Sequence, residues 1–294
     1  MKRTMLSEAE EPQALALETK LLIEAIYERY HYDFRGYSPI SIARQLNRAK
    51  ERFGCRTLSM LQHRVLHEPA IMPELLNLLT IQVSDLFRDP SYFRALREHV
   101  IPHLVTYPSL KVWIAGCGDG EELYSLAILF REEGLASRTI FYATDINQAA
   151  LRKAEAGVYD LERLPLFTEN HRRSGGKTSL STYYTAAYGA AVFDRSLCEN
   201  VVFSDHSLAS DQVFAEVHLV SCRNVLIYFD RELQDRAIGI FDDALVRGGF
   251  LGLGAQESVR LSRHSTKFNE FSMKERIYRK ISASQSGGEK RDIA

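Results

Sequence analysis

The sequence predicts a two-domain protein, in which a small all-helical domain precedes a doubly wound α/β domain with a small antiparallel insertion. Three observations lead to this prediction. Apolar residues recur at helical spacing between residues 18 and 83, strand-length apolar runs alternate with helical patterns after residue 108, and the alternation breaks between about residues 164 and 202. The length of 294 residues also suits two domains.

The N-terminal region has the spacing of amphipathic helices. Its apolar positions form two main groups, Leu21, Leu22, Ala25 and Ile26 in the first and Leu75, Leu76, Leu78 and Leu79 in the second. Turn signals at residues 35–39, Gly54 and Pro73 divide the region into short helices. We expect a flexible tail over residues 1–12 and the helical domain over residues 13–85.

The second domain is expected over residues 86–282, followed by a flexible tail at 283–294. Continuous apolar runs at 112–115, 140–143, 217–220 and 250–253 are typical of strands covered on both faces, which indicates a parallel sheet. The insertion, about residues 164–202, contains the aromatic pair Tyr183 and Tyr184 and is expected to form a small antiparallel hairpin.

Composition excludes several classes of protein. Hydrophobic residues make up 45% and charged residues 26%, and the net charge of −1 lacks the basic excess typical of nucleic-acid binders. Four cysteines without a C-x-x-C pair indicate reduced thiols. No apolar run approaches the roughly 18 residues of a membrane span. We therefore expect a cytoplasmic protein that neither binds nucleic acid nor inserts into a membrane.

A glycine-rich loop follows the first predicted strand. Gly116, Gly118 and Gly120 lie between that strand and a helix that begins near Glu121, where the backbone must turn tightly and approach a ligand. Acidic residues at the helix start would repel a pyrophosphate, so the loop favours a cationic or zwitterionic ligand. Asp145 ends the second strand, where a carboxylate can accept hydrogen bonds from ribose hydroxyls, although it could instead cap a helix.

Four segments together resemble the signatures of the CheR-type chemoreceptor glutamate methyltransferases. They are residues 85–89 (DLFRD), 116–125 (GCGDGEELYS), 143–146 (ATDI) and 221–230 (SCRNVLIYFD). The similarity extends from about Glu18 to Ile281. It implies a class I methyltransferase-like fold and transfer of a methyl group from S-adenosylmethionine to glutamate carboxylates of the receptor's cytoplasmic domain, by a monomeric enzyme without a metal.

The resemblance also implies which residues hold the cofactor. Glu121 would accept from its amino group, Asp145 would accept from the ribose hydroxyls, and Arg88 would lie near its carboxylate. The other matching positions are Gln82, Ser84, Gly116, Gly118, Ser207, Leu208, Arg223 and Asn224. The family more often has asparagine at the position of Gln82, threonine at that of Ser84 and asparagine at that of Ser207. For Glu122, stabilisation of the helix start is the expected role.

Two residues are expected at the reacting centre. Arg88 can hold carboxylates with defined geometry, and Tyr228 can bring its ring toward the sulfonium and the incoming glutamate. The alternatives are a surface salt bridge for Arg88 and a core position for Tyr228. Because the acceptor carboxylate is already ionised at pH 7, no general base is required.

A basic helix is the candidate receptor-binding surface. Arg44, Arg48 and Arg52 are spaced four residues apart between residues 41 and 58, a segment that also contains Arg56 and the single acid Glu51. The alternative is a solvated face. In the family the corresponding helix faces the acidic methylation region of the receptor.

The insertion predicts that the receptor's C-terminal tail is not used. Some members of the family bind a pentapeptide at that tail through an arginine-containing loop, whereas the hairpin at residues 183–193 has no charged residue. Arg172 and Arg173 lie outside the matching loop. We expect an enzyme that recognises the methylation region directly.

Two other functions remain open from the sequence. One is a class I methyltransferase that acts on RNA or a small molecule, against which the near-neutral charge counts. The other is a module that senses S-adenosylmethionine without turnover, for which Arg88 and Tyr228 would have no use.

Overall fold

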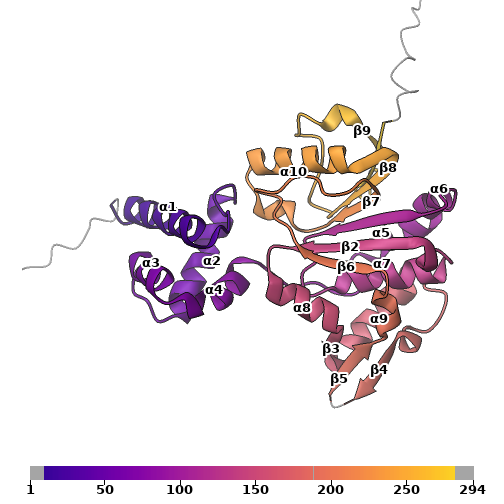
Figure 1. Cartoon of the computed structure of the whole chain (residues 1–294), viewed down its shortest axis with the longest axis horizontal. Coiled ribbons are helices and arrows are strands. Elements are labelled where there is room, and N and C mark those ends of the chain that lie inside the picture. Colours follow the sequence, from indigo (N-terminus) through magenta and orange to yellow (C-terminus); the bar gives the residue numbers. More distant parts are fainter. Residues whose placement is uncertain (1–9, 188, 282–294) are drawn as a thin grey trace, which may run out of the picture. The chain divides into compact units, whose positions relative to one another are not determined.

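The computed structural model describes residues 10–187 and 189–281, which form two compact units (Figure 1). The first unit comprises residues up to 81 together with residues 228–233, and the second comprises residues 82–227 and those from 234 onward. The expected tails at 1–12 and 283–294 lie outside the described residues, except that a helix already begins at Glu10. The two units divide after residue 81, four residues before the domain boundary that the sequence analysis expected after residue 85.

The first unit contains four helices. They are α1 (Glu10–Tyr30), α2 (Pro39–Arg52), α3 (Leu58–His67) and α4 (Met72–Leu79), with a 3-10 turn at Pro69–Ile71. Local sequence explains their limits, because Pro39 opens α2 and the Thr57 hydroxyl accepts the Met60 N–H at the start of α3. Gly54 turns the chain after α2 with a φ of 64°. The helices bury Leu22, Ile26, Leu46, Leu61 and Leu75.

The second unit is built on a seven-stranded sheet in the order β6-β2-β1-β7-β8-β10-β9. The strands are β1 (Leu110–Ala115), β2 (Thr139–Asp145), β6 (Val201–Asp205), β7 (Val217–Cys222), β8 (Leu245–Leu253), β9 (Phe268–Ser272) and β10 (Ile277–Lys280). The first five in spatial order are parallel, whereas β10 is antiparallel to both of its neighbours. The expected doubly wound sheet is confirmed, and the antiparallel edge is an addition to it.

Helices cover both faces of this sheet (Figure 1). Successive residues of a strand point to opposite faces. Trp113 of β1 contacts Phe241 of α10 (Arg231–Ala244), with ring centroids 5.4 Å apart. Its neighbours Val112 and Ile114 belong to the buried cluster that includes Phe130 of α7 (Glu121–Glu132). This two-sided burial explains why the strands are continuously apolar.

Shorter helices complete the second unit. They are α5 (Pro90–Ala95), a π-helical turn (Leu96–Val100), α6 (Ile101–Leu104), α8 (Gln148–Ala156) and α9 (Leu164–Arg173), with 3-10 turns at Ala136–Arg138, Leu161–Arg163, Leu180–Tyr183, Arg195–Cys198, Leu226–Tyr228 and Ser265–Lys267. Helix α8 packs against β2 and β6.

The insertion forms a separate three-stranded antiparallel sheet in the order β3-β5-β4. Strands β4 (Tyr184–Ala187) and β5 (Ala190–Phe193) make the expected hairpin. The third strand, β3 (Val158–Asp160), comes from residues before 164, where the insertion was expected to begin. Its three residues were too few to give a recognisable pattern.

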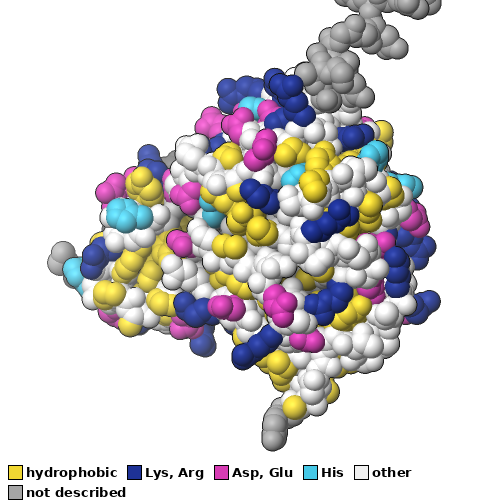
Figure 2. Space-filling view, turned by 45° about the vertical axis from the view of Figure 1, so that its right-hand side comes forward, with side chains coloured by type: hydrophobic (Ala, Val, Ile, Leu, Met, Phe, Trp, Pro, Cys, Tyr) yellow, Lys and Arg dark blue, Asp and Glu magenta, His cyan; other side chains and the backbone are white. Residues whose placement is uncertain are grey.

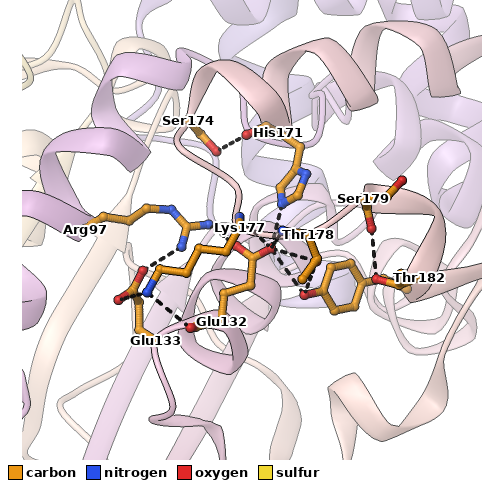
Figure 3. Close-up of polar contacts among 10 residues, drawn as sticks. Arg97, Glu132, Glu133, His171, Ser174, Lys177, Thr178, Ser179 and Thr182 are labelled. Atoms are coloured by element: carbon orange, nitrogen blue, oxygen red, sulfur yellow. Dashed lines mark hydrogen bonds and ion pairs between the residues drawn. The ribbon is translucent and has the colours of Figure 1, made fainter.

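A buried ion-pair cluster joins the insertion to α7 (Figure 3). The Glu132 side chain is 1% exposed and pairs with Arg97 and with His171 of α9. Its Oε1 also accepts the backbone N–H groups of Lys177 (3.2 Å) and Thr178 (3.3 Å). One carboxylate therefore connects α7 with two segments of the insertion.

The surface carries charges of both signs. Figure 2 shows Lys and Arg side chains interspersed with Asp and Glu over the face it presents, in keeping with the net charge of −1. Among the described residues, no helix combines the length and the apolar character needed to cross a bilayer.

Candidate functional site

The glycine loop connects the end of β1 to α7. Gly116, Gly118 and Gly120 have φ values of 75°, 57° and 100°, which favour glycine. A Cβ at Gly116 would lie 2.4 Å from Val225, and one at Gly118 would lie 2.9 Å from the Gln82 Oε1. The positive φ values agree with the tight turn that the sequence predicted, and the packing against Val225 and Gln82 is a further reason for glycine at these positions.

Asp145 supports this loop from the end of β2. Its carboxylate accepts the Gly118 N–H and the Asn147 N–H, each at 2.9 Å. Burial raises the pKa of Asp145, against the effect of these hydrogen bonds. The helix α8 is capped by the side chain of Asn147, which accepts the N–H groups of Ala149 and Ala150, so Asp145 is not the helix cap.

Glu121, the first residue of α7, is 1% exposed. Its Oε1 pairs with Nη1 of Arg163 at 2.9 Å, whereas its Oε2 is buried and has no hydrogen-bond partner among the described residues. Burial raises the pKa of Glu121. This oxygen is therefore available to accept a hydrogen bond from a ligand.

Two polar side chains near the loop also have an unsatisfied buried oxygen. These are Oε1 of Gln82 and Oδ1 of Asp119, for which the described residues supply no partner. Ser84 contributes its backbone carbonyl, which accepts from Arg163. Arg163 thereby joins the Ser84 segment to Glu121, and sequence reasoning missed it because nothing in its local pattern marks it.

Arg88 lies on a strained turn. Phe87 and Asp89 on either side of it have φ values of 52° and 57°, which non-glycine residues rarely adopt. The Phe87 N–H donates to Oγ of Ser125 at 2.7 Å, which holds the turn against α7. Arg88 is half-buried and forms no ion pair within the described part of the chain, so a surface salt bridge does not explain it.

Arg223 at the end of β7 is enclosed by protein groups. Its guanidinium pairs with Oε2 of Glu122 (2.9 Å) and Oδ2 of Asp89 (2.7 Å), and it donates to the Arg88 carbonyl at 3.0 Å. It also lies over the ring of Tyr92, 4.1 Å from the centroid. Arg223 thus connects α7 to the Arg88 turn. Glu122, for which the sequence predicted only stabilisation of the helix start, also forms an ion pair with Arg223.

Asn224 has a left-handed backbone, with a φ of 62°. Its N–H donates to Oε2 of Glu257 at 3.0 Å. Sequence reasoning did not identify Glu257, because it lies outside the four matching segments.

Ser207 and Leu208 follow β6, whose last residue Asp205 is in register with Asp145. The Ser207 hydroxyl accepts the Ala209 N–H at 3.3 Å, and Leu208 is buried. Of the predicted residues, Gly116, Asp145, Ser207 and Arg223 follow or end parallel strands at their carboxyl ends. Contacts add Gln82 beside Gly118, Ser84 through Arg163 to Glu121, and Arg88 through its carbonyl to Arg223.

The remaining candidates belong to the first unit. Tyr228 ends the turn Leu226–Tyr228 and groups with the helical unit. Arg44, Arg48 and Arg52 all lie exposed on α2, and Arg52 pairs with Glu74 of α4 at 2.6 Å. Arg56, which the sequence analysis placed in the same basic segment, lies beyond the end of this helix.

Comparison with known families covers both units. The model described as "CheR methyltransferase, all-alpha domain" matches residues 17–80, and the model described as "CheR methyltransferase, SAM binding domain" matches residues 82–277. The two matches meet where the structure divides the chain.

Several individual proteins are similar to this chain in sequence or fold. A protein of Pseudomonas putida (strain KT2440) with the provisional name methyltransferase Cher3 is 55% identical over 264 residues, which is 90% of this chain and 97% of that protein. A chemotaxis protein methyltransferase of Listeria innocua is 34% identical over 64% of this chain and 70% of its own length. A solved magnesium protoporphyrin IX methyltransferase from Synechocystis PCC 6803 is 22% identical over 55% of each chain, with a TM-score of 0.30.

Proposed function

The chain belongs to the CheR methyltransferase family, and from that premise we propose that it methylates glutamate side chains in the cytoplasmic signalling domains of chemoreceptors. As a member it is an S-adenosylmethionine-dependent methyltransferase. The products would be glutamate methyl esters that adjust receptor signalling. The family match across both units is the observation that carries this proposal.

The residues of the second unit suit this cofactor. The unsatisfied Oε2 of Glu121 is an acceptor for the cofactor's ammonium group, and the buried carboxylate of Asp145 has capacity for ribose hydroxyls. A side chain at Gly116 or Gly118 would collide with Val225 or Gln82, so these two positions of the loop have only backbone to present to a ligand. We assign Ser207 and Leu208 to the adenine, and Gln82, Ser84 and Asn224 to further polar contacts.

The proposed chemistry needs little from the protein beyond placement. The sulfonium supplies an activated methyl group, and a glutamate carboxylate is ionised at pH 7. Arg88 would orient the incoming carboxylate with its guanidinium. Tyr228 is assigned to the reacting centre by its position in the matching segment, for the cation–π and hydroxyl contacts that its side chain can make. Arg223 would act indirectly, by positioning Arg88, since it donates hydrogen bonds to the Arg88 carbonyl and to Asp89.

Recognition of the receptor is assigned to α2. Exposed Arg44, Arg48 and Arg52 complement an acidic methylation region. Strands β4 and β5 contain no charged residue, so a receptor's terminal carboxylate would find no cationic partner there. We therefore propose an enzyme that acts without tail binding, and we further propose that it is a cytoplasmic monomer.

The test is incubation with methyl-labelled S-adenosylmethionine and purified receptor signalling domains. We expect label in the receptor that is released as methanol by mild base, which distinguishes esters from methylated amines. Signalling domains with their acceptor glutamates changed to alanine are the matched control. Label that persists in that control, or label transferred instead to RNA, would reject the proposal. Cofactor binding without any methyl transfer would favour the alternative function, a module that senses S-adenosylmethionine without turnover.

A further inference from the structure

Glu257 is a buried carboxylate that faces the loop after β7. It is 4% exposed and lies just beyond the end of β8. Its Oε2 accepts the N–H groups of Gly254 (2.6 Å) and Asn224 (3.0 Å), and its Oε1 accepts the N–H of Ile227 (3.3 Å). One side chain thus satisfies three backbone donors from two loops.

These three hydrogen bonds require that the Glu257 side chain be a carboxylate. A carboxylate offers only acceptors, whereas an amide of the same size would present an N–H₂ group to some of these donors. Burial raises the pKa of Glu257, and the backbone hydrogen bonds act in the opposite direction. Among the described residues no cation pairs with it, so backbone dipoles are its main compensation.

The loop that Glu257 contacts has an unfavourable backbone. Asn224 has a φ of 62°, a conformation that persists only when the surroundings impose it. Packing behind the loop is equally tight, because a Cβ at Gly254 would lie 2.8 Å from both the Asn224 nitrogen and the Glu257 Oε2. The carboxylate and the glycine together determine where this loop runs.

We propose that Glu257 is a positioning residue for the cofactor site, which holds the backbone of residues 224–227 so that Asn224 is presented to S-adenosylmethionine. Val225 adds a second connection, since its side chain contacts the position where a Cβ of Gly116 would be. Displacing the loop therefore disturbs the glycine turn as well. The inference rests on the proposed assignment of Asn224 to the cofactor site.

The first test is Glu257→Gln, with affinity for S-adenosylhomocysteine measured by calorimetry on the full chain. Either orientation of the amide loses the Ile227 contact or the pair from Gly254 and Asn224. We expect affinity to fall at least tenfold, and the KM for S-adenosylmethionine to rise more than the KM for the receptor domain.

Glu132→Gln is the matched control. The Glu132 side chain is 1% exposed and also accepts two backbone N–H groups, but these belong to the insertion. The Glu132→Gln variant should have a lower melting temperature than the parent protein and a cofactor affinity within twofold of it. A purely structural Glu257 would behave in the same way, so a melting-temperature loss with unchanged affinity in Glu257→Gln would overturn the inference.

A second variant covers the case in which Glu257→Gln does not fold. Gly254→Ala pushes a methyl group against the same hydrogen bonds and leaves the carboxylate intact. We expect the same loss of cofactor affinity, and unchanged affinity in the folded variant would contradict the inference. Because binding is measured without a methyl acceptor, failure to form glutamate esters would reject the proposed function and leave this result standing.

Discussion

Single carboxylates organise the candidate site, each through partners distant in sequence. Asp145 holds the glycine loop through Gly118, and Glu121 keeps one oxygen free while Arg163 neutralises the other. Glu122 fixes Arg223, which in turn holds the Arg88 turn. Removing one such group leaves its buried partners unsatisfied, so residue-scale changes should have large effects.

Asp145→Ala and Glu121→Ala should each weaken cofactor binding by about 1–3 kcal/mol, because each removes an acceptor for a ligand donor that would then be buried unpaired. Calorimetry with S-adenosylhomocysteine measures the change. Asp160→Ala, an exposed carboxylate of β3, is the control and should bind normally. Affinities within twofold of the parent in both site variants would refute the assignment.

Arg88→Ala should abolish methyl ester formation, since the acceptor carboxylate loses its cationic partner. The assay is transfer of label to the receptor domain. Arg94→Ala is the control, because Arg94 is an exposed arginine nearby whose guanidinium donates to a backbone carbonyl. Substantial transfer by the Arg88 variant would show that this side chain is not needed for the reaction.

Among the elements, α7 is connected at both ends, to the glycine loop through Glu121 and to the insertion through Glu132. Burial alone would raise the pKa of Glu132, but His171 and Arg97 outweigh it and lower the pKa to about 2 (Figure 3). A carboxyl group with a lowered folded-state pKa stabilises the fold above its ordinary value near 4.5 and loses that effect as pH falls toward 2.

We therefore expect wild-type stability to fall between pH 4.5 and pH 2 more steeply than that of Glu132→Gln. The difference should reach on the order of 3 kcal/mol at neutral pH and shrink with acidification. Urea unfolding at pH 7, 4 and 3 measures it. A gap independent of pH would mean that the Glu132 charge contributes nothing to stability.

The exposed face of α2 carries the second prediction at this scale. Arg44→Glu with Arg48→Glu should slow receptor methylation, and raised salt should have a similar effect on the parent by screening. Cofactor affinity should not change. Lys20→Glu with Arg29→Glu alters net charge equally on the exposed part of α1 and serves as the control. Equal rates for the two double variants would indicate that the α2 arginines are merely solvated.

For the whole molecule, the insertion and the charge balance bear on how the receptor is found. The net charge of −1 provides no general attraction to an acidic partner, so recognition must depend on local surfaces. The hairpin β4–β5 lacks the cation that a terminal carboxylate needs.

Receptors with and without their C-terminal pentapeptide should therefore be methylated at equal rates, and the isolated pentapeptide should show no binding at micromolar concentration in calorimetry. A truncated receptor methylated much more slowly than the intact one would contradict this. So would micromolar affinity for the free peptide, in which case Arg172 and Arg173 would be the residues to change first.

The sequence by itself determined the order and type of the main elements and the backbone of the glycine loop. Helical spacing, continuous apolar strands and glycine at positive φ are local properties, so Leu75 and Leu79, Val112 to Ala115, and Gly116 to Gly120 could be interpreted without knowing their partners. The four matching segments also contain most of the residues that we assign to the cofactor site.

Only the tertiary structure decided which charges meet. Arg163 with Glu121, Arg223 with Glu122 and Asp89, and Glu257 with the Asn224 backbone each join segments far apart along the chain. Such pairs leave no periodic trace, because their energy depends on burial and on mutual geometry that exist only after the sheet and helices have packed. The short strand β3 and the antiparallel edge were missed for the same physical reason, since pairing with neighbouring strands stabilises them more than their own sequence does.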